Sequence, residues 1–168
     1  AKYENYVYEG YGPGGVAIMM EVMTDNKNRT VPDIRHIMST NGGHLGESGC
    51  VNWMFEKKGT ITISKEGVNE DAVLEKSLEL GADDFESAND VIEITTSPDS
   101  FGEVSSGLEE EGFEIEGEVG LAPVNSVNVS RNDAKQLLQL LEKLEDHEDI
   151  QKVYSNFDLD ESDIESLL

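Results

Sequence analysis

Hydrophobic residues in the first third of the chain mark three successive elements. A continuous apolar run at 16–23 follows a glycine-rich stretch and predicts a central strand that is covered on both faces. Apolar residues then recur at helical spacing over 27–40, where Asn26 or Asn28 can cap the helix and two glycines end it. The third element is a strand over 50–56, predicted from three alternating apolar residues, Val51, Trp53 and Phe55.

A second series of elements follows a turn that we predict at Lys57-Lys58-Gly59. Its order is strand, helix, hairpin, helix and strand, and the segments are 61–63, 73–81, 84–95, 97–112 and 113–121. Because the hairpin contributes two strands, the order is β-α-β-β-α-β. This is the order of elements in a ferredoxin-like domain.

The segments that flank this series predict the same order once they are joined. Strand, helix and strand precede it, and a short strand near 126–129, a helix from Arg131 and a strand at 153–156 follow it. We therefore expect an α+β fold of two ferredoxin-like βαββαβ domains, one inserted into the other. The outer domain is expected at 1–58 plus 122–168 and the inserted, acidic domain at 59–121.

A plain tandem of two domains is the alternative arrangement. It would leave the segment 131–156 without strand partners, which is why we favour the insertion. At the start, Ala1-Lys2-Tyr3 lacks an initiator Met and runs into a strand-like segment, which indicates a trimmed beginning. At the other end, the acidic tail from Asp158 to Leu168 is expected to fray.

Charge sets limits on what this chain can bind. Lys and Arg total 12 against 36 Asp and Glu, so the formal net charge is -24. Such a surface repels phosphate backbones at long range, and we expect no non-specific binding to nucleic acid. The acidity is typical of a solubility surface or of a salty cytoplasm. A docking surface for a basic protein is the functional alternative.

Residues that could carry chemistry are few and scattered. The single cysteine, Cys50, excludes an internal disulfide and suits a reducing compartment, so we expect the cytoplasm. Nothing resembles a signal peptide, and no apolar run is long enough to span a bilayer. His36, His44 and His147 are too far apart in the pattern to predict a metal site with Cys50. We expect no cofactor, no metal, no catalytic residue and no enzyme.

Four short motifs follow one another in the first third of the chain. They read YEGYGPGG at 8–15, TDNKNRT at 24–30, NGGHLG at 41–46 and SGCV at 48–51. Together they resemble the YebC family, which includes bacterial transcriptional regulators and a mitochondrial translational activator of a cytochrome oxidase subunit. The resemblance implies a non-enzymatic role in transcription or in translation on ribosomes. It also implies the cytoplasm, or the mitochondrial matrix if the source is eukaryotic.

Members of this family carry a basic helical domain upstream of these motifs, and this sequence lacks it. The resemblance therefore implies that contact with DNA, RNA or the ribosome lies mainly in that missing domain. The present chain would then act as a positioning and interaction module. A small-ligand sensor is the alternative function, by analogy with ferredoxin-like repeats that bury metabolites between domains. A hydrolase with clustered carboxylates is a third hypothesis, and it would require a metal.

Basic residues gather in the first part of the chain, since none occurs between Lys76 and Arg131. Cations beside amides and a hydroxyl at a helix start are suited to contact phosphates. The residues expected to contact nucleic acid or the ribosome are Lys27, Asn28, Arg29, Arg35, Lys57 and Lys58. In the structural alternative, Asp25 and the asparagines cap the helix and Arg29 pairs with a carboxylate.

Two glycine motifs complete the candidate contact surface. The first, Tyr11-Gly12-Pro13-Gly14-Gly15, leads into a strand, whereas a phosphate cradle needs a following helix N-terminus. We therefore predict a tight turn with a positive φ angle at one or more glycines and no nucleotide site. This rigid loop could still contact a macromolecule, as could the second motif, Asn41-Gly42-Gly43.

Overall fold

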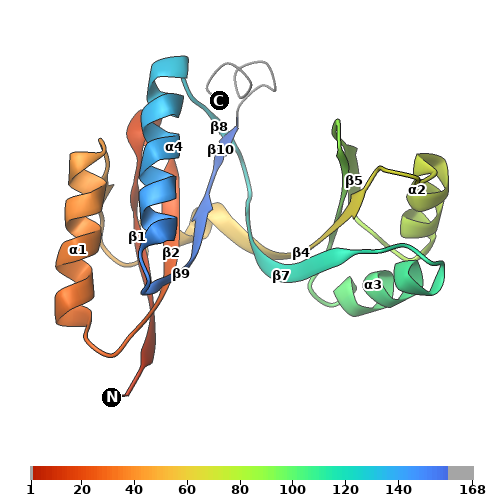
Figure 1. Cartoon of the computed structure of the whole chain (residues 1–168), viewed down its shortest axis with the longest axis horizontal. Helices are drawn as coiled ribbons and strands as arrows, with labels where there is room; N and C mark the ends of the chain where they lie inside the picture. Colours follow the sequence, from red (N-terminus) through yellow and green to blue (C-terminus); the bar gives the residue numbers. More distant parts are fainter. Residues whose placement is uncertain (1, 159–168) are drawn as a thin grey trace. The chain divides into compact units, whose positions relative to one another are not determined.

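The computed structural model describes residues 2–158, which form two compact units. The first unit holds the described residues up to Phe55 and from Pro123 onward, and the second comprises Glu56–Ala122. The chain leaves the first unit once and later returns to it (Figure 1). Each unit has a four-stranded sheet and two helices, so the fold is α+β with two ferredoxin-like domains, one inserted into the other. The tail predicted to fray lies outside the described range apart from Asp158, which is part of a short strand.

The first unit is built on a sheet with the order β3-β1-β2-β9, in which all neighbours are antiparallel. Its strands are β1 (Glu4–Tyr11), β2 (Ala17–Thr24), β3 (His44–Leu45) and β9 (Ile150–Ser155). The other regular elements of this unit are α1 (Lys27–Thr40), α4 (Arg131–Asp146), two 3₁₀ turns (Pro13–Gly15 and Asn52–Met54), and the parallel pair β8 (Val127–Asn128) and β10 (Phe157–Asp158).

Alternation along β2 explains why both helices pack on one face of this sheet. Ile18, Met20 and Val22 point to the same face and are at most 1% exposed. They form one core with residues of α1 and α4 that recur every three or four positions, namely Ile34, Met38, Leu137, Leu140 and Leu144. The predictions of a buried strand near 16–23 and of an amphipathic helix on each side of the insertion are confirmed.

The second unit has the predicted order of elements. It contains β4 (Phe55–Ser64), α2 (Glu70–Glu79), β5 (Asp84–Ser87), β6 (Val91–Thr96), α3 (Phe101–Glu110) and β7 (Glu116–Pro123). The sheet order is β5-β6-β4-β7, so the first and third strands lie in the middle. Ile61, Ile63, Ile92 and Ile94 alternate along these two strands and form the core with residues of both helices.

The first unit reaches the same arrangement of strands by another route. In the second unit, the third strand follows the second through a hairpin. In the first unit, the place beside β2 is taken by β1, because the short loop at Gly12–Val16 lets the two pair directly. The strand predicted near 126–129 is β8, which pairs with β10 and does not join the four-stranded sheet. Its assignment to that sheet was wrong.

Residues 50–59 also differ from the prediction. The alternating residues predicted as a strand over 50–56 include a 3₁₀ turn in which Trp53 is 69% exposed, and the strand begins only at Phe55. The turn predicted at Lys57-Lys58-Gly59 lies inside β4. Gly59 is buried in this strand, since a Cβ atom there would collide with Thr96 and Phe101. This glycine therefore serves close packing and not a turn.

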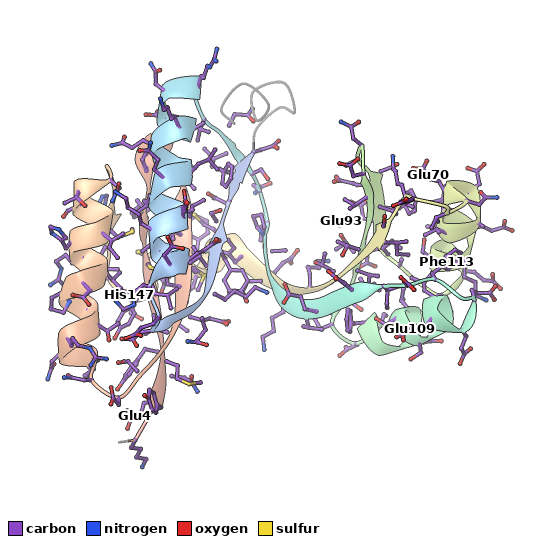
Figure 2. All side chains as sticks on the ribbon, in the orientation of Figure 1. Glu4, Glu70, Glu93, Glu109, Phe113 and His147 are labelled. Atoms are coloured by element: carbon purple, nitrogen blue, oxygen red, sulfur yellow. The ribbon has the colours of Figure 1, made fainter. Side chains whose placement is uncertain are left out.

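Most of the negative charge lies in the second unit. Residues 56–122 contain 19 acidic and 4 basic side chains. Figure 2 labels three of these acidic residues, Glu70 on α2, Glu93 on β6 and Glu109 on α3. Among residues 2–158, no helix combines the length and the apolar character that crossing a membrane requires.

Candidate contact surface on the first unit

Polar contacts fix the start of α1, where one of the sequence motifs lies. Thr24 Oγ1 accepts a hydrogen bond from the Asn26 amide (3.1 Å). The Asn26 carbonyl in turn accepts from the amides of Arg29 and Thr30 (3.1 and 3.2 Å). Asn26 is the N-cap residue, as one alternative predicted, but its side chain makes no capping hydrogen bond. Thr24 Oγ1 instead accepts from the amide of the N-cap residue itself, so it fixes the turn that leads into α1.

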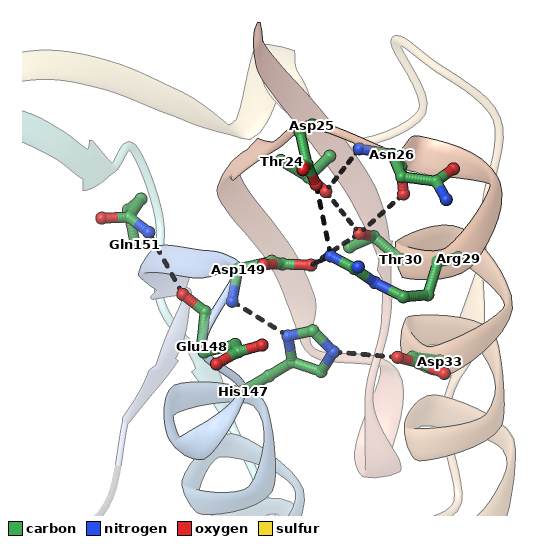
Figure 3. A network of polar contacts seen from close by, with 10 residues as sticks. All are labelled: Thr24, Asp25, Asn26, Arg29, Thr30, Asp33, His147, Glu148, Asp149 and Gln151. Carbon is green, nitrogen blue, oxygen red and sulfur yellow. Dashed lines mark hydrogen bonds and ion pairs between the residues drawn. The ribbon is translucent and has the colours of Figure 1, made fainter. Parts of the chain in front are cut away.

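A buried carboxylate from the far end of the chain completes this network (Figure 3). Asp149 is 6% exposed, and its Oδ2 accepts hydrogen bonds from Thr30 Oγ1 (2.7 Å) and Arg29 Nη2 (3.3 Å). Its backbone carbonyl accepts from the Met23 amide (2.9 Å). Arg29 also pairs with Asp25 at 3.5 Å. The network therefore joins the start of α1 to the residues that lead into β9.

The pKa values of the two charged partners follow from these contacts. The Thr30 hydroxyl, and then the Arg29 guanidinium, hold the pKa of Asp149 below its ordinary 3.8. The hydrogen bond to Asp149 raises the pKa of Arg29. Pairing of Arg29 with a carboxylate was the alternative to a phosphate contact, and Arg29 does pair with Asp25 and Asp149. The Arg29 side chain is still 53% exposed, so it also faces solvent.

His147 extends the network from the end of α4. Its Nδ1 accepts a hydrogen bond from the Asp149 amide (3.1 Å), and its Nε2 lies 3.2 Å from Asp33 Oδ2 on α1. The imidazole thus bridges the two helices. Nothing in the local sequence pattern indicated His147 or Asp149, and the Thr30 hydroxyl was expected to contact phosphate. Their partners in this network lie more than a hundred residues away.

Three side chains on one face of α1, Lys27, Val31 and Arg35, line a groove of about 400 Å³. The opposite wall is the segment 6–9 of β1, and Leu45, Gly46 and Ser48 close the groove. Two of the predicted cations therefore come together in one hollow. Arg29 instead turns toward Asp149, and Asn28 is exposed.

Aromatic rings form part of the β1 wall. The rings of Tyr6 and Tyr8 stack with centroids 6.1 Å apart, and Lys27 Nζ lies 5.5 Å from the Tyr6 centroid. The Tyr6 hydroxyl donates to Glu4 Oε2 (2.8 Å), and this contact raises the pKa of Tyr6. Burial raises the pKa of Tyr8. Tyr6 is thus contacted by Lys27 on one side and by Tyr8 on another.

A second buried carboxylate fixes the loop at the end of the groove. Glu9 is 4% exposed and accepts hydrogen bonds from the amides of Gly49 (2.6 Å), Val51 (2.9 Å) and Asn52 (2.6 Å). Its backbone carbonyl accepts from the Gly46 amide (2.8 Å). The carboxylate therefore accepts hydrogen bonds from backbone amides of this loop that would otherwise have no partner. Glu9 lies inside the motif at 8–15, but no local pattern indicated that its carboxylate holds this loop.

The two glycine motifs lie side by side in the fold. Gly43 packs so closely on Tyr11 that a Cβ atom would come within 2.5 Å of the Tyr11 carbonyl. Gly14 and Gly15 have φ angles of 79° and 78°, which confirms the predicted turn with positive φ. Both motifs pack against α4, since Cβ atoms at Gly12 and Gly42 would meet Leu137 and Gln136.

Asn41 has a structural role at this junction. It is 6% exposed, its Nδ2 donates to the Ile37 carbonyl (2.7 Å), and its Oδ1 accepts from Lys143 Nζ (3.2 Å). The side chain therefore ends α1 and ties it to α4. The remaining predicted contacts, Lys57 and Lys58, lie on β4 and belong to the second unit, where Lys58 pairs with Glu56 (3.9 Å) and Asp83 (3.5 Å).

Groups of three or more His, Cys, Asp or Glu side chains that could hold a metal ion do not occur among residues 2–158. Cys50 is partly buried, and its pKa is raised by burial and then by the nearby Glu9 carboxylate. A raised pKa disfavours the thiolate, which is the nucleophilic form.

Comparison with known proteins decides the family. Residues 3–157, which include both units, match the family model described as the second and third domain of TACO1/YebC. This chain belongs to the YebC family. It is 53% identical to a probable transcriptional regulatory protein of Dictyoglomus turgidum over 98% of this chain and 67% of the relative. It is 51% identical to a protein of the same description from Natranaerobius thermophilus, again over 98% of this chain and 67% of the relative.

A solved structure supports the fold of this family member. The crystal structure of a conserved hypothetical protein from Aquifex aeolicus superimposes with a TM-score of 0.86 at 40% identity. The match covers 95% of this chain and 66% of that one. The YebC-family chain thus spans about two thirds of the length of the relatives it matches.

Proposed function

We propose that this chain is the positioning and interaction part of a regulator of gene expression, which acts by binding and not by catalysis. The observation that carries the proposal is the match to proteins named probable transcriptional regulatory proteins at about half identity over both units. Such identity over the cores and the motif loops supports a role in regulation like the one that the names of these relatives give. The relatives are longer than this chain, and we propose that their further part supplies additional contacts.

The cationic side of α1 is the proposed contact for nucleic acid or the ribosome. Lys27, Asn28 and Arg35 are exposed there, and the glycine motifs present rigid backbone at the other end of the helix. In a chain of net charge -24, a phosphate backbone is attracted only where cations outnumber carboxylates. Arg29 is paired with Asp25 and Asp149. Its side chain is still half exposed, so we propose that it also contributes to the phosphate contact.

The acidic second unit is proposed to face a basic protein or the basic domain that the family resemblance implies. On its sheet, Glu86 of β5 lies directly opposite Glu93 of β6, an arrangement that costs stability. A basic partner would relieve that repulsion. Lys57, exposed on β4, is the cation of this unit that we propose for a further phosphate contact.

Ribosome co-sedimentation across a salt series tests the role in translation. The chain would be compared with the full-length Dictyoglomus turgidum relative. We expect the full-length protein to bind with a steep loss at higher salt, and this chain to bind more weakly. In the chain with both Lys27→Ala and Arg35→Ala, the slope of log affinity against log salt should fall by about two, one for each lost phosphate contact.

The matched control is Lys135→Ala, an exposed cation on α4 outside the groove, which should leave the slope unchanged. Equal effects of the control and the double variant would contradict the proposed contact residues. If neither protein sediments with ribosomes, the same variants would be measured on promoter DNA. Absence of binding there as well would contradict the proposal as a whole.

A further inference from the structure

Most of β1 has no strand partner on its outer side among the described residues. β3 pairs only with Gly10 and Tyr11, and the Gly46 amide then donates to the Glu9 carbonyl. Backbone groups of a strand point alternately to its two edges. The N–H and C=O groups of Asn5 and Val7 therefore face the same edge as those of Glu9. A strand edge of this kind is a template for pairing with another chain.

The groove beside α1 runs along this free edge. Its walls are the segment 6–9 of β1 and the α1 row Lys27, Val31 and Arg35. An extended chain laid on the edge would find backbone partners on β1 and would turn every second side chain toward α1. Such side chains are about 7 Å apart, close to the rise of about 6 Å between helix residues four positions apart. An extended strand therefore fits both walls.

The charge of the groove selects the kind of strand. Lys27 and Arg35 place two cations on the rim, and Val31 lies between them with Tyr8 and Leu45 as apolar neighbours. Two carboxylates of β1 have partners, since Glu9 accepts three amide hydrogen bonds and Glu4 accepts from the Tyr6 hydroxyl. The complement is an aliphatic side chain flanked by acidic ones.

We propose that this groove binds an extended acidic segment of a partner protein, which adds a strand to β1 opposite Asn5 and Val7. Main-chain hydrogen bonds would supply affinity, and the pocket at Val31 with its two cations would supply specificity. This inference goes beyond the proposed function. Because Lys27 and Arg35 also belong to the nucleic-acid contact proposed above, an acidic peptide and a nucleic acid would compete for these two cations.

A single-stranded nucleic acid is the other polymer that a cationic groove with aromatic side chains could hold. Binding of that kind uses open ring faces on which bases stack. Tyr6 is already contacted by Lys27 and Tyr8, so the ring pair is used within the protein. The free N–H and C=O groups of β1 also have no matching repeat in a nucleic acid. The geometry therefore favours a peptide.

Two kinds of substitution separate the contributions of backbone and charge. Val7→Pro removes an outward N–H group without removing a hydrogen bond between β1 and β2, which is where proline is tolerated in strands. Arg35→Glu reverses the rim charge. Lys135→Glu, on the exposed side of α4, is the matched control for charge reversal.

The experiment pans a random decapeptide display library on this chain and measures the selected peptides by fluorescence anisotropy. We expect them to be rich in Asp and Glu alternating with Val, Ile or Leu. Val7→Pro and Arg35→Glu should each weaken binding by about tenfold or more, and Lys135→Glu by less than about twofold. N-methylation of alternate peptide residues removes the N–H groups that would pair with β1 and should abolish binding. This test changes the peptide and leaves the protein unchanged.

Three results would overturn the proposal. The first is that no peptide is enriched, or that the enriched peptides are not acidic. The second is that N-methylated peptides bind as well as unmodified ones, a result that stands even if Val7→Pro fails to fold. The third is that a deca-thymidine oligonucleotide binds more tightly than any selected peptide and is displaced by none. That last outcome would assign the groove to nucleic acid.

Discussion

Asp149 and Glu9 are carboxylates with almost no exposure, and each is surrounded by hydrogen-bond donors. An ionised group can stay buried only when its charge is matched by such donors. Asp149 receives them from a hydroxyl and a guanidinium on α1, and Glu9 receives them from three amides within residues 49–52. Both residues therefore fix one segment against another, and together they shape the two sides of the candidate surface.

Replacing Asp149 by Asn should lower the stability of the first unit by about 1 to 3 kcal/mol, because buried donors lose an ionised acceptor. The pKa of Asp149 lies below 3.8 in the fold, so its contribution is present above that pH. It is lost as the pH falls through the folded pKa. Thermal unfolding from pH 7 to pH 2 should therefore show the variant and the wild type converging in acid.

The control for this prediction is Asp25→Asn, which removes only the partly exposed ion pair to Arg29. We expect it to cost between about 0 and 1 kcal/mol at pH 7. A loss from Asp25→Asn as large as that from Asp149→Asn would show that the salt bridge, and not the buried acceptor, stabilises the helix start.

At the scale of elements, helix α3 contains two glycines in contrasting surroundings. A Cβ atom at Gly102 would meet nothing within 4 Å, whereas one at Gly107 would come within 2.5 Å of Leu80 Cδ1. Gly107 is buried where α3 packs near α2, so its lack of a side chain permits close packing. Gly102 lies in the exposed first turn, where no close packing requires a glycine.

Gly102→Ala should therefore stabilise the chain by up to about 1 kcal/mol, the difference in helix propensity. Gly107→Ala should destabilise it by about 1 to 3 kcal/mol, since Leu80 must move in a packed core. Urea unfolding monitored by circular dichroism measures both. Opposite signs are the expected result, and equal effects would mean that the contact with Leu80 is relieved without cost.

The β5–β6 hairpin contains a repulsive pair of carboxylates. Desolvation, and then the Glu86 and Asp84 carboxylates, raise the pKa of Glu93 above its ordinary 4.5. A raised pKa means that the folded state holds the proton more tightly, so stability falls as the pH rises through this range. Glu93→Gln should raise the melting temperature at pH 7, and the difference should disappear below about pH 4. Differential scanning calorimetry of Glu93→Gln beside Glu110→Gln, an exposed change on α3, checks this.

For the whole molecule, the two units have separate hydrophobic cores that share no residue. A segment with its own core and a complete sheet can fold alone. We expect residues 56–122 to unfold cooperatively as an isolated fragment, and added salt should raise its melting temperature by screening its excess of carboxylates. A fragment that stops at 115 lacks β7 and should not unfold cooperatively. Calorimetry at two salt concentrations measures both, and a non-cooperative 56–122 fragment would contradict independent folding.

Local patterns in the sequence were sufficient to predict the order of elements in the second unit. Its apolar residues alternate in strands and recur at helical spacing in helices, and short loops join each element to the next. Local pattern is sufficient there because consecutive elements are neighbours in space. The motifs likewise identified the family, and the positive φ angles at Gly14 and Gly15 followed from glycine chemistry.

The arrangement of the first unit and of its surface depends on contacts between residues far apart in the sequence. With only two residues, β3 is too short to give a pattern. The turn at Gly12–Val16 was predicted, but not that it lets β1 pair with β2 in the place of the third strand. The predicted cations were separated in the same way: Lys27 and Arg35 meet in a groove, while Arg29 is drawn to Asp149 across 120 positions of sequence. Hydrophobic periodicity encodes which face of an element is buried, but it carries no information on which distant partner buries it.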